Sequence, residues 1–175
     1  MTMMMKAGKK MMMRATLLVV AVLGWCGVAA GADCAAYLRF YGALDGRVEL
    51  RTEADMRHYD DYGRYLGKTE VEDDGERRFY DDYGRYLGKS ETDGRRTRFY
   101  DDYGRYLGQM EAESRGRIRY ADDYGRMLGY AEHEARGEIR YYDAMGRLRG
   151  KSVREGGKVR FYDDYGRYIG YSESR

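Results

Sequence analysis

Paired carboxylates are the residues of this sequence that could most readily do chemistry. Aspartates recur in pairs before a Tyr-Gly-Arg triplet, as at Asp81-Asp82 and Asp101-Asp102, and such pairs can bind calcium or act as general acid and base. Calcium takes about six to eight oxygen ligands, however, and no dense run of alternating acids supplies them. An aspartate can also accept hydrogen bonds from backbone amides at the start of a turn. We therefore expect the first aspartate to cap a turn and the second to face solvent, with neither binding a metal.

Other catalytic and metal-binding patterns are missing from the sequence. The two histidines, His58 and His133, lie in different units without a cysteine partner, whereas zinc sites and histidine-based triads need several such groups together. A nucleophile elbow, a phosphate loop and a zinc motif are absent as well. We predict that the protein is not an enzyme, that it uses no cofactor and that both histidines lie on its surface.

Arginine and tyrosine repeat as regularly as aspartate. An arginine follows each turn glycine, from Arg64 to Arg167, where it can line a stripe for acidic polymers, bond the turn aspartate or stack on a nearby tyrosine. Acids match bases in number, which favours local bonding. Rows of tyrosine can stack sugars or grip an extended peptide, but they can also fill a thin core, which is the simpler interpretation. The best candidate binding face consists of Tyr80, Tyr86, Tyr100, Tyr106, Tyr142, Tyr162, Tyr168, Arg98, Arg140 and Arg160.

These residues recur because the chain is a tandem repeat. Seven Gly-Arg dipeptides mark the units, with a first spacing of 17 residues and later spacings of 20 or 21, and a fixed period of this size is the signature of a modular array. The clearest copy spans residues 99–108, and the unit at 40–47 resembles a degenerate cap. The last unit stops half a repeat short, so the array ends within a unit.

Each unit contains two turn signals. The first is Asp-Asp-Tyr-Gly, in which the aspartate can start a type I turn and the glycine can take the left-handed conformation that closes a hairpin with a bulge. The second is a polar segment with glycine, such as Thr92-Asp93-Gly94. Two turns in each repeat leave strands of about six or seven residues, close to the usual strand length. No segment after residue 32 shows sustained helical periodicity.

The residues between the turns alternate as they do in a β-strand. Phe99 alternates with Arg98 and Tyr100, and other units repeat this order, so one face is apolar and the other carries arginine and tyrosine. With a four-residue loop, Phe99 lies opposite Leu107 and Tyr100 lies opposite Tyr106, in a register that could shift by one residue.

A glycine occupies the same mid-strand place in every complete unit, where we expect a bend or bulge with a tyrosine ring covering the bare backbone. These glycines are Gly67, Gly88, Gly108, Gly129, Gly150 and Gly170. We predict an all-β protein, an antiparallel β-hairpin repeat array of about seven units of 20–21 residues with the geometry of a twisted meander or solenoid. Closure of the strands into a ring or barrel is the alternative.

The first 32 residues have the composition of a secretory signal peptide. They contain four basic residues and no acid, then the apolar run Leu17–Leu23 and the small-residue site Ala30-Gly31-Ala32. The stretch 15–32 is only 18 residues long and is broken by glycines, whereas a membrane span needs about 20 apolar residues. We expect cleavage before Asp33, an N-terminal segment at 33–58 that includes the degenerate unit, and a hairpin-repeat domain at 59–175. The protein is then exported, to the periplasm or cell surface of a bacterium.

The cysteine positions and the charge balance exclude further kinds of bond and partner. Cys26 lies within the signal and Cys34 would be the second residue of the processed chain, so no internal disulfide can form, and Cys34 could be free, lipidated or linked between molecules. Processing leaves 28 basic and 30 acidic residues. Nucleic-acid binding requires a basic stripe, so we exclude nucleic acid as a partner.

The segment from Gly94 through Tyr100-Asp101 to Gly104-Arg105 resembles the YD-repeat family, the tyrosine-aspartate hairpin repeats of bacterial Rhs-type and teneurin proteins. The pattern recurs over most of the processed chain, with Ala121 in place of the tyrosine in one unit. The layout is also similar to the hairpin repeats of choline-binding and glucan-binding wall modules, although the one tryptophan, Trp25, lies in the signal. Both resemblances imply a hairpin architecture, and the second implies contact with carbohydrate or wall polymer.

The sequence leaves two functional hypotheses. The first is a non-enzymatic binding or scaffolding module that contacts a cell-envelope polysaccharide or a protein through repeated tyrosine and arginine surfaces. The second is a purely structural protein that associates with itself through exposed end strands. Neither identifies the ligand or the oligomeric state.

Overall fold

The computed structural model describes residues 54–72 and 75–174. They form twelve strands and two single 3-10 turns, η2 (Ser114–Gly116) and η3 (Ala135–Gly137). The strands are β1 (Met56–Asp60), β2 (Tyr65–Val71), β3 (Arg77–Asp81), β4 (Tyr86–Asp93), β5 (Arg96–Asp101), β6 (Tyr106–Ala112), β7 (Arg117–Asp122), β8 (Met127–His133), β9 (Glu138–Asp143), β10 (Leu148–Glu155), β11 (Lys158–Asp163) and β12 (Tyr168–Ser174). The expected signal peptide, the degenerate first unit and both cysteines lie outside the described residues. Within the described ranges, no helix is long and apolar enough to cross a membrane.

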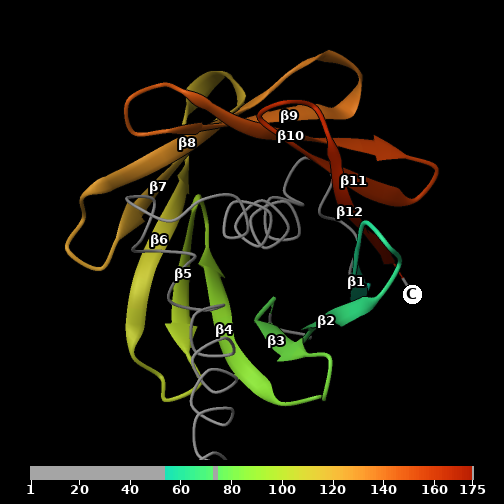
Figure 1. Ribbon diagram of the computed structural model, residues 1–175. Helices are drawn as coiled ribbons and strands as arrows, with labels where there is room; N and C mark the ends of the chain where they lie inside the picture. Colours follow the sequence, from blue (N-terminus) through green and yellow to red (C-terminus); the bar gives the residue numbers. More distant parts are fainter. Residues whose placement is uncertain (1–53, 73–74, 175) are drawn as a thin grey trace, which may run out of the picture.

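The twelve strands close into a barrel. Each strand pairs antiparallel with its neighbours in sequence, and β12 returns to pair with β1, as the succession of colours from teal through green, yellow and orange to red shows in Figure 1. The closing register runs from Met56 opposite Ser174 to Asp60 opposite Gly170. The hairpin array is confirmed, in the closed form that was the alternative. Because β1 and β12 pair with each other, neither is a free edge through which another copy could add.

The two kinds of turn lie at opposite ends of the barrel. Each turn that starts with the aspartate of the Asp-x-x-Gly-Arg repeat joins an odd-numbered strand to the next even-numbered strand, and each polar turn joins an even strand to the next odd one. Neighbouring strands are antiparallel, so all turns of one kind share one rim. The polar rim also holds the start of β1 and the end of β12. The repeat therefore places six aspartate turns around the other rim.

Inside the barrel, large side chains face small ones. The Phe99 ring lies between Ser90 of β4 and Gly108 of β6 in the register of the sheet, and it is 2% exposed. Equivalent positions repeat this order in the other units except on β6, where Met110 lies opposite Tyr120, and alternation of large and small residues lets the interior interdigitate. The apolar face is confirmed as the inner face. Its buried cluster consists of Phe79, Phe99, Met110, Ile118, Tyr120, Ala131, Ile139 and Tyr141.

The register of each hairpin contains a β-bulge. Tyr100 lies opposite Tyr106, as expected from the sequence, but Phe99 lies opposite Gly108 and not opposite Leu107. The expected Phe99–Leu107 pair is therefore wrong, because Leu107 is the extra residue of the bulge on β6. The bulge turns the Leu107 side chain toward the buried cluster, against which it packs.

The mid-strand glycine allows two backbones to approach each other. A Cβ at Gly108 would lie 2.4 Å from the carbonyl oxygen of Ala121 on β7, and φ at Gly108 is 145°. The bulge expected beside these glycines is confirmed, and at Gly67, Gly88, Gly108 and Gly129 the atom nearest an added Cβ is a carbonyl oxygen of the next strand. Glycine is needed here because any side chain would collide with the main chain.

Candidate functional site

The aspartate turns share one hydrogen-bond pattern. In the turn between β5 and β6, the Gly104 amide donates to the Asp101 carbonyl at 3.0 Å and the Asp101 amide donates to the Arg105 carbonyl at 3.0 Å. The Asp101 carboxylate accepts from the amides of Tyr103 and Arg105 through Oδ1, at 3.0 and 2.8 Å, and from the Arg105 guanidinium through Oδ2, at 2.6 Å. Six aspartates make these three bonds: Asp60, Asp81, Asp101, Asp122, Asp143 and Asp163.

These bonds hold the Asp101 carboxylate ionised although its side chain is only 4% exposed. Burial would raise the pKa of Asp101, but the hydrogen bonds from Arg105 and from the Tyr103 amide lower that pKa below its ordinary value. Turn capping by the first aspartate and local bonding by the turn arginine are therefore both confirmed. The carboxylates are structural groups in which both oxygens accept hydrogen bonds from their own turn.

One natural replacement separates the roles of the two aspartates. In the turn after β9, Ala144 takes the place of the second aspartate, yet Asp143 still bonds the Met145 and Arg147 amides at 3.0 and 2.9 Å. The second aspartate is exposed in the other five turns. In the part of the chain that the structure describes, no group of three or more His, Cys, Asp or Glu residues is placed to hold a metal.

The variant Asp101→Ala should lose about 2 kcal/mol of unfolding free energy, because two backbone amides and a guanidinium lose a charged acceptor. The matched change Asp102→Ala, at the exposed neighbour, should cost less than about 0.5 kcal/mol. Urea unfolding followed by circular dichroism measures both values. Equal losses in the two variants would contradict the role assigned to the first aspartate.

A ring of exposed side chains occupies the tips of the aspartate turns. These tip residues are between 77% and 83% exposed, whereas the exposed large side chains on the barrel wall reach only 36% to 41%. We call this set the tyrosine rim; it consists of Tyr62, Tyr83, Tyr103, Tyr124, Met145 and Tyr165. Each rim tyrosine has the guanidinium of its own turn arginine over one ring face, at 5.3 to 5.9 Å from the centroid.

The exposed position of the rim tyrosines was not predicted from the sequence, where the tyrosine of Asp-Asp-Tyr-Gly was interpreted only as part of a turn signal. A usable signal was present, because a large ring at the tip of a tight hairpin points away from both strands and has no neighbouring element to cover it.

The tyrosines of the candidate binding face lie on the outer wall of the barrel. Tyr100 and Tyr106 meet edge to face, with centroids 6.0 Å apart, and Tyr106 is 37% exposed. The same contact joins Tyr80 to Tyr86 and Tyr162 to Tyr168, at 5.9 Å each. Tyr142 instead stacks on Tyr130 at 4.9 Å. We call these three edge-to-face pairs the wall pairs; Tyr59 and Tyr65 make the same contact at 5.8 Å. They do not fill the core, which corrects the simpler interpretation of the tyrosine rows.

The arginines of the candidate face also lie on the outer wall, among acids. Arg140 binds Glu138 and Glu134 at 2.8 and 3.8 Å, and Arg160 binds Glu155. Arg98 lies between Glu91 and Gln109 in the sheet register.

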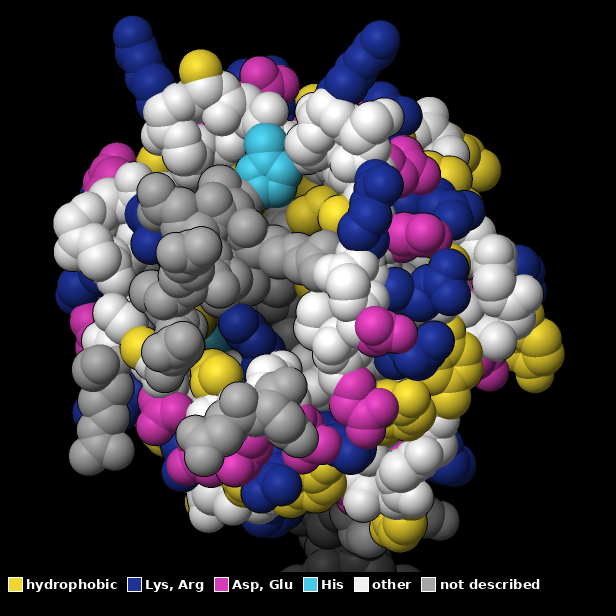
Figure 2. Space-filling model, turned by 180° about the vertical axis from the view of Figure 1, so that it is seen from behind, with side chains coloured by type: hydrophobic (Ala, Val, Ile, Leu, Met, Phe, Trp, Pro, Cys, Tyr) yellow, Lys and Arg dark blue, Asp and Glu magenta, His cyan; other side chains and the backbone are white. Residues whose placement is uncertain are grey.

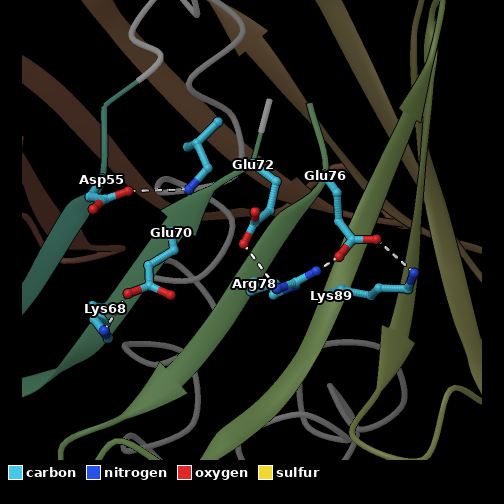
Figure 3. A network of polar contacts seen from close by, with 8 residues as sticks. Asp55, Lys68, Glu70, Glu72, Glu76, Arg78 and Lys89 are labelled. Carbon is cyan, nitrogen blue, oxygen red and sulfur yellow. Dashed lines mark hydrogen bonds and ion pairs between the residues drawn. The ribbon is translucent and has the colours of Figure 1, made fainter. Parts of the chain in front are cut away.

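The same mixing of charge continues over β2 to β4. Figure 3 shows Arg78 between Glu72 and Glu76, at 3.0 and 2.9 Å, and Lys89 on the second oxygen of Glu76 at 2.7 Å. Lys and Arg side chains interleave with Asp and Glu over the face seen in Figure 2. A wall of this kind attracts neither acidic nor basic polymers strongly.

Only one of the two histidines lies at the surface, although both were expected there. His58 of β1 points into the barrel, where Nδ1 is 2.8 Å from the Ser172 hydroxyl of β12 and Nε2 is 2.9 Å from the Thr69 hydroxyl of β2. The surface position expected for His58 is wrong, and burial lowers its pKa to about 4. His133 lies at the end of β8 and lines a surface hollow beside Glu132, whose carboxylate is bound by Arg117 at 2.6 Å.

Comparison with known proteins does not assign this barrel to a family. No family model matches the chain. No curated protein matches it either. A protein of known X-ray structure from Arabidopsis thaliana aligns with a TM-score of 0.47 and 12% identity, over 69% of this chain and 79% of that one. BamB from Moraxella catarrhalis aligns with a TM-score of 0.26 and 9% identity, over 62% of this chain and 54% of that one. Similarities of this strength carry no functional inference.

Proposed function

We propose that the barrel is an exported, non-enzymatic binding module that contacts a cell-envelope glycan through repeated tyrosine surfaces. The observation that carries this proposal is the position of the repeated rings. They lie outside the barrel, in the wall pairs and in the tyrosine rim, while the interior is filled by other side chains. Exposed rings can stack on the flat C–H faces of sugars, and a tyrosine hydroxyl can bond sugar hydroxyls.

Rigid presentation supports the proposal. The edge-to-face contact holds each wall pair, and three hydrogen bonds to a buried aspartate hold each rim turn. Rings that are ordered before binding lose little entropy when a ligand arrives. Because a rim tyrosine recurs in five of the six described hairpins, a polymer of repeating sugar units can engage several rings at once, and weak single contacts add up to useful affinity.

Co-sedimentation with insoluble peptidoglycan and cell-envelope polysaccharides tests the proposal. The double variant Tyr100→Ala, Tyr106→Ala and the triple variant Tyr83→Ser, Tyr103→Ser, Tyr124→Ser should each weaken retention by about tenfold, the loss expected for removing a few aromatic contacts. The control Val153→Ser changes a wall residue that has no ring and should bind as the unmodified protein does.

Two outcomes would overturn the proposal. The first is retention on no polysaccharide. The second is retention that both tyrosine variants leave unchanged. Sedimentation velocity on the same samples distinguishes the rival hypothesis, because concentration-dependent assembly without glycan binding would indicate a self-associating structural protein.

A further inference from the structure

The tyrosine rim differs from the wall in charge as well as in exposure. Each rim turn carries an arginine whose charge is balanced by the buried first aspartate, which lies within 2.8 Å of its Nε. The second aspartates form no such ion pair among the described residues, although Asp61 and Asp164 help to raise the pKa of their turn arginines, Arg64 and Arg167. These second aspartates are exposed between the rim tyrosines in five of the six turns: Asp61, Asp82, Asp102, Asp123 and Asp164. The six turn arginines and six first aspartates cancel, so the rim carries a net charge of −5.

The polar rim provides an internal comparison. At its turn tips the basic residues Arg115 and Arg136 are exposed, and each lies two residues from an exposed acid, Glu113 or Glu134. Both signs therefore meet at that end of the barrel. Concentrated negative charge together with exposed rings is a property of the tyrosine rim among the surfaces that the structure describes.

We propose that the tyrosine rim binds a glycan that carries free amino groups, a proposal that rests on the glycan-binding function above and specifies its ligand. The exposed rings supply the contact surface, and the net negative charge of the rim favours a positively charged glycan. An ammonium group gains energy both from carboxylates and from the faces of aromatic rings. The sugar ring that bears the ammonium group stacks its C–H face on a rim tyrosine, while the ammonium reaches the aspartate beside that tyrosine.

The geometry of one turn leaves room for this contact. The Arg105 guanidinium lies over one face of the Tyr103 ring at 5.6 Å, and its Nε is held by Asp101. The opposite face of the ring is free of any cation that the structure shows, and Tyr103 is 81% exposed. Asp102, the next residue in the chain, is exposed and makes no ion pair among the described residues. Repetition around the rim suits a ligand whose own units repeat.

The test compares two oligomers of β-1,4-linked glucosamine that have equal length and differ only in N-acetylation. Isothermal titration with the full chain should give about tenfold tighter binding to the free-amine oligomer, and this preference should shrink as salt is raised. The triple variant Asp82→Asn, Asp102→Asn, Asp123→Asn should reduce the preference to about threefold or less, while it leaves the affinity for the acetylated oligomer unchanged.

A control separates rim charge from total charge. The variant Glu91→Gln, Glu111→Gln, Glu132→Gln removes the same number of negative charges from the wall and should keep the full preference for the free-amine oligomer. Thermal melting confirms that both triple variants fold.

Each other outcome has a defined meaning. Equal affinity for the two oligomers overturns the amino-glycan proposal but leaves the proposed glycan function in place. Tighter binding of polylysine than of the free-amine oligomer overturns the proposal in favour of a basic protein partner. Binding of neither oligomer overturns it as well, and the polysaccharide sedimentation described above then decides separately whether glycan binding itself fails.

Discussion

Replacing Gly88 with alanine should destabilise the barrel by about 3 kcal/mol or more, or prevent it from folding. A Cβ at Gly88 would lie 2.2 Å from the carbonyl oxygen of Tyr100 on β5, and φ at Gly88 is 140°. A side chain at such a φ costs about 1–3 kcal/mol, and forcing two backbones apart in a packed sheet adds about 1–3 kcal/mol more. Neither strand can move away, because each is also paired on its other side.

The matched control is Gly94→Ala in the polar turn between β4 and β5. Gly94 also has a positive φ, 56°, but a Cβ there would meet nothing within 4 Å. The control should therefore cost only about 1–2 kcal/mol, the price of a left-handed backbone conformation for alanine. Urea midpoints of the two variants measure the difference. If the two glycines cost the same, close approach of the backbones is not the reason for glycine in mid-strand.

Local features of the fold could be predicted from the sequence because they depend on neighbouring residues. The turn before Gly104 follows from the Asp101 carboxylate and the left-handed glycine. The inward direction of Phe99 follows from its alternation with Arg98. The position of the bulge at Leu107 was harder to predict. It depends on a contact between strands, the close approach of Gly108 to the Ala121 carbonyl of the next strand.

Closure of the barrel could not be read from any single unit. Whether twelve strands end as an open meander or as a ring depends on the summed twist and stagger of every hairpin, and small changes in each unit accumulate. The repeat period is the same in both cases. For the same reason the outward position of the wall pairs was ambiguous, since a thin open array would have needed Tyr100 and Tyr106 on its buried face.

The residue that breaks the repeat lies at the closing seam. Phenylalanine or tyrosine takes the inward ring position in the other five odd strands, as at Phe79 and Tyr141, whereas β1 has His58 there. Its two ring nitrogens contact hydroxyls on the strands at either side, Ser172 of β12 and Thr69 of β2. A phenylalanine or tyrosine ring at this position could not make both polar contacts. His58 therefore links the last strand of the array to the first hairpin.

The free energy of unfolding should fall by up to about 3 kcal/mol as the pH is lowered from 6.5 to about 4, because His58 has an ordinary pKa of 6.5 and burial lowers it to about 4 in the folded barrel. Between these values the unfolded chain binds a proton that the folded barrel does not, so acid favours unfolding. Carboxylates with lowered pKa values, such as Asp101 and Glu76, add to the loss only at the acid end of this range, because their stabilisation declines as the pH falls through their ordinary pKa values of 3.8 and 4.5. Urea unfolding at a series of pH values measures the slope.

The variant His58→Phe should remove most of this pH dependence, because it installs the ring type of the other odd strands and takes away the buried titrating group. At neutral pH it should cost about 1–2 kcal/mol, since the Ser172 and Thr69 hydroxyls lose their partner inside the barrel. The slope is therefore the diagnostic quantity, and the absolute stability is not. An unchanged slope in His58→Phe would mean that another group, such as His133, whose pKa is also lowered by burial, controls the response to acid. A lost slope together with a weakened barrel would show that the closing seam depends on a neutral imidazole between two hydroxyls.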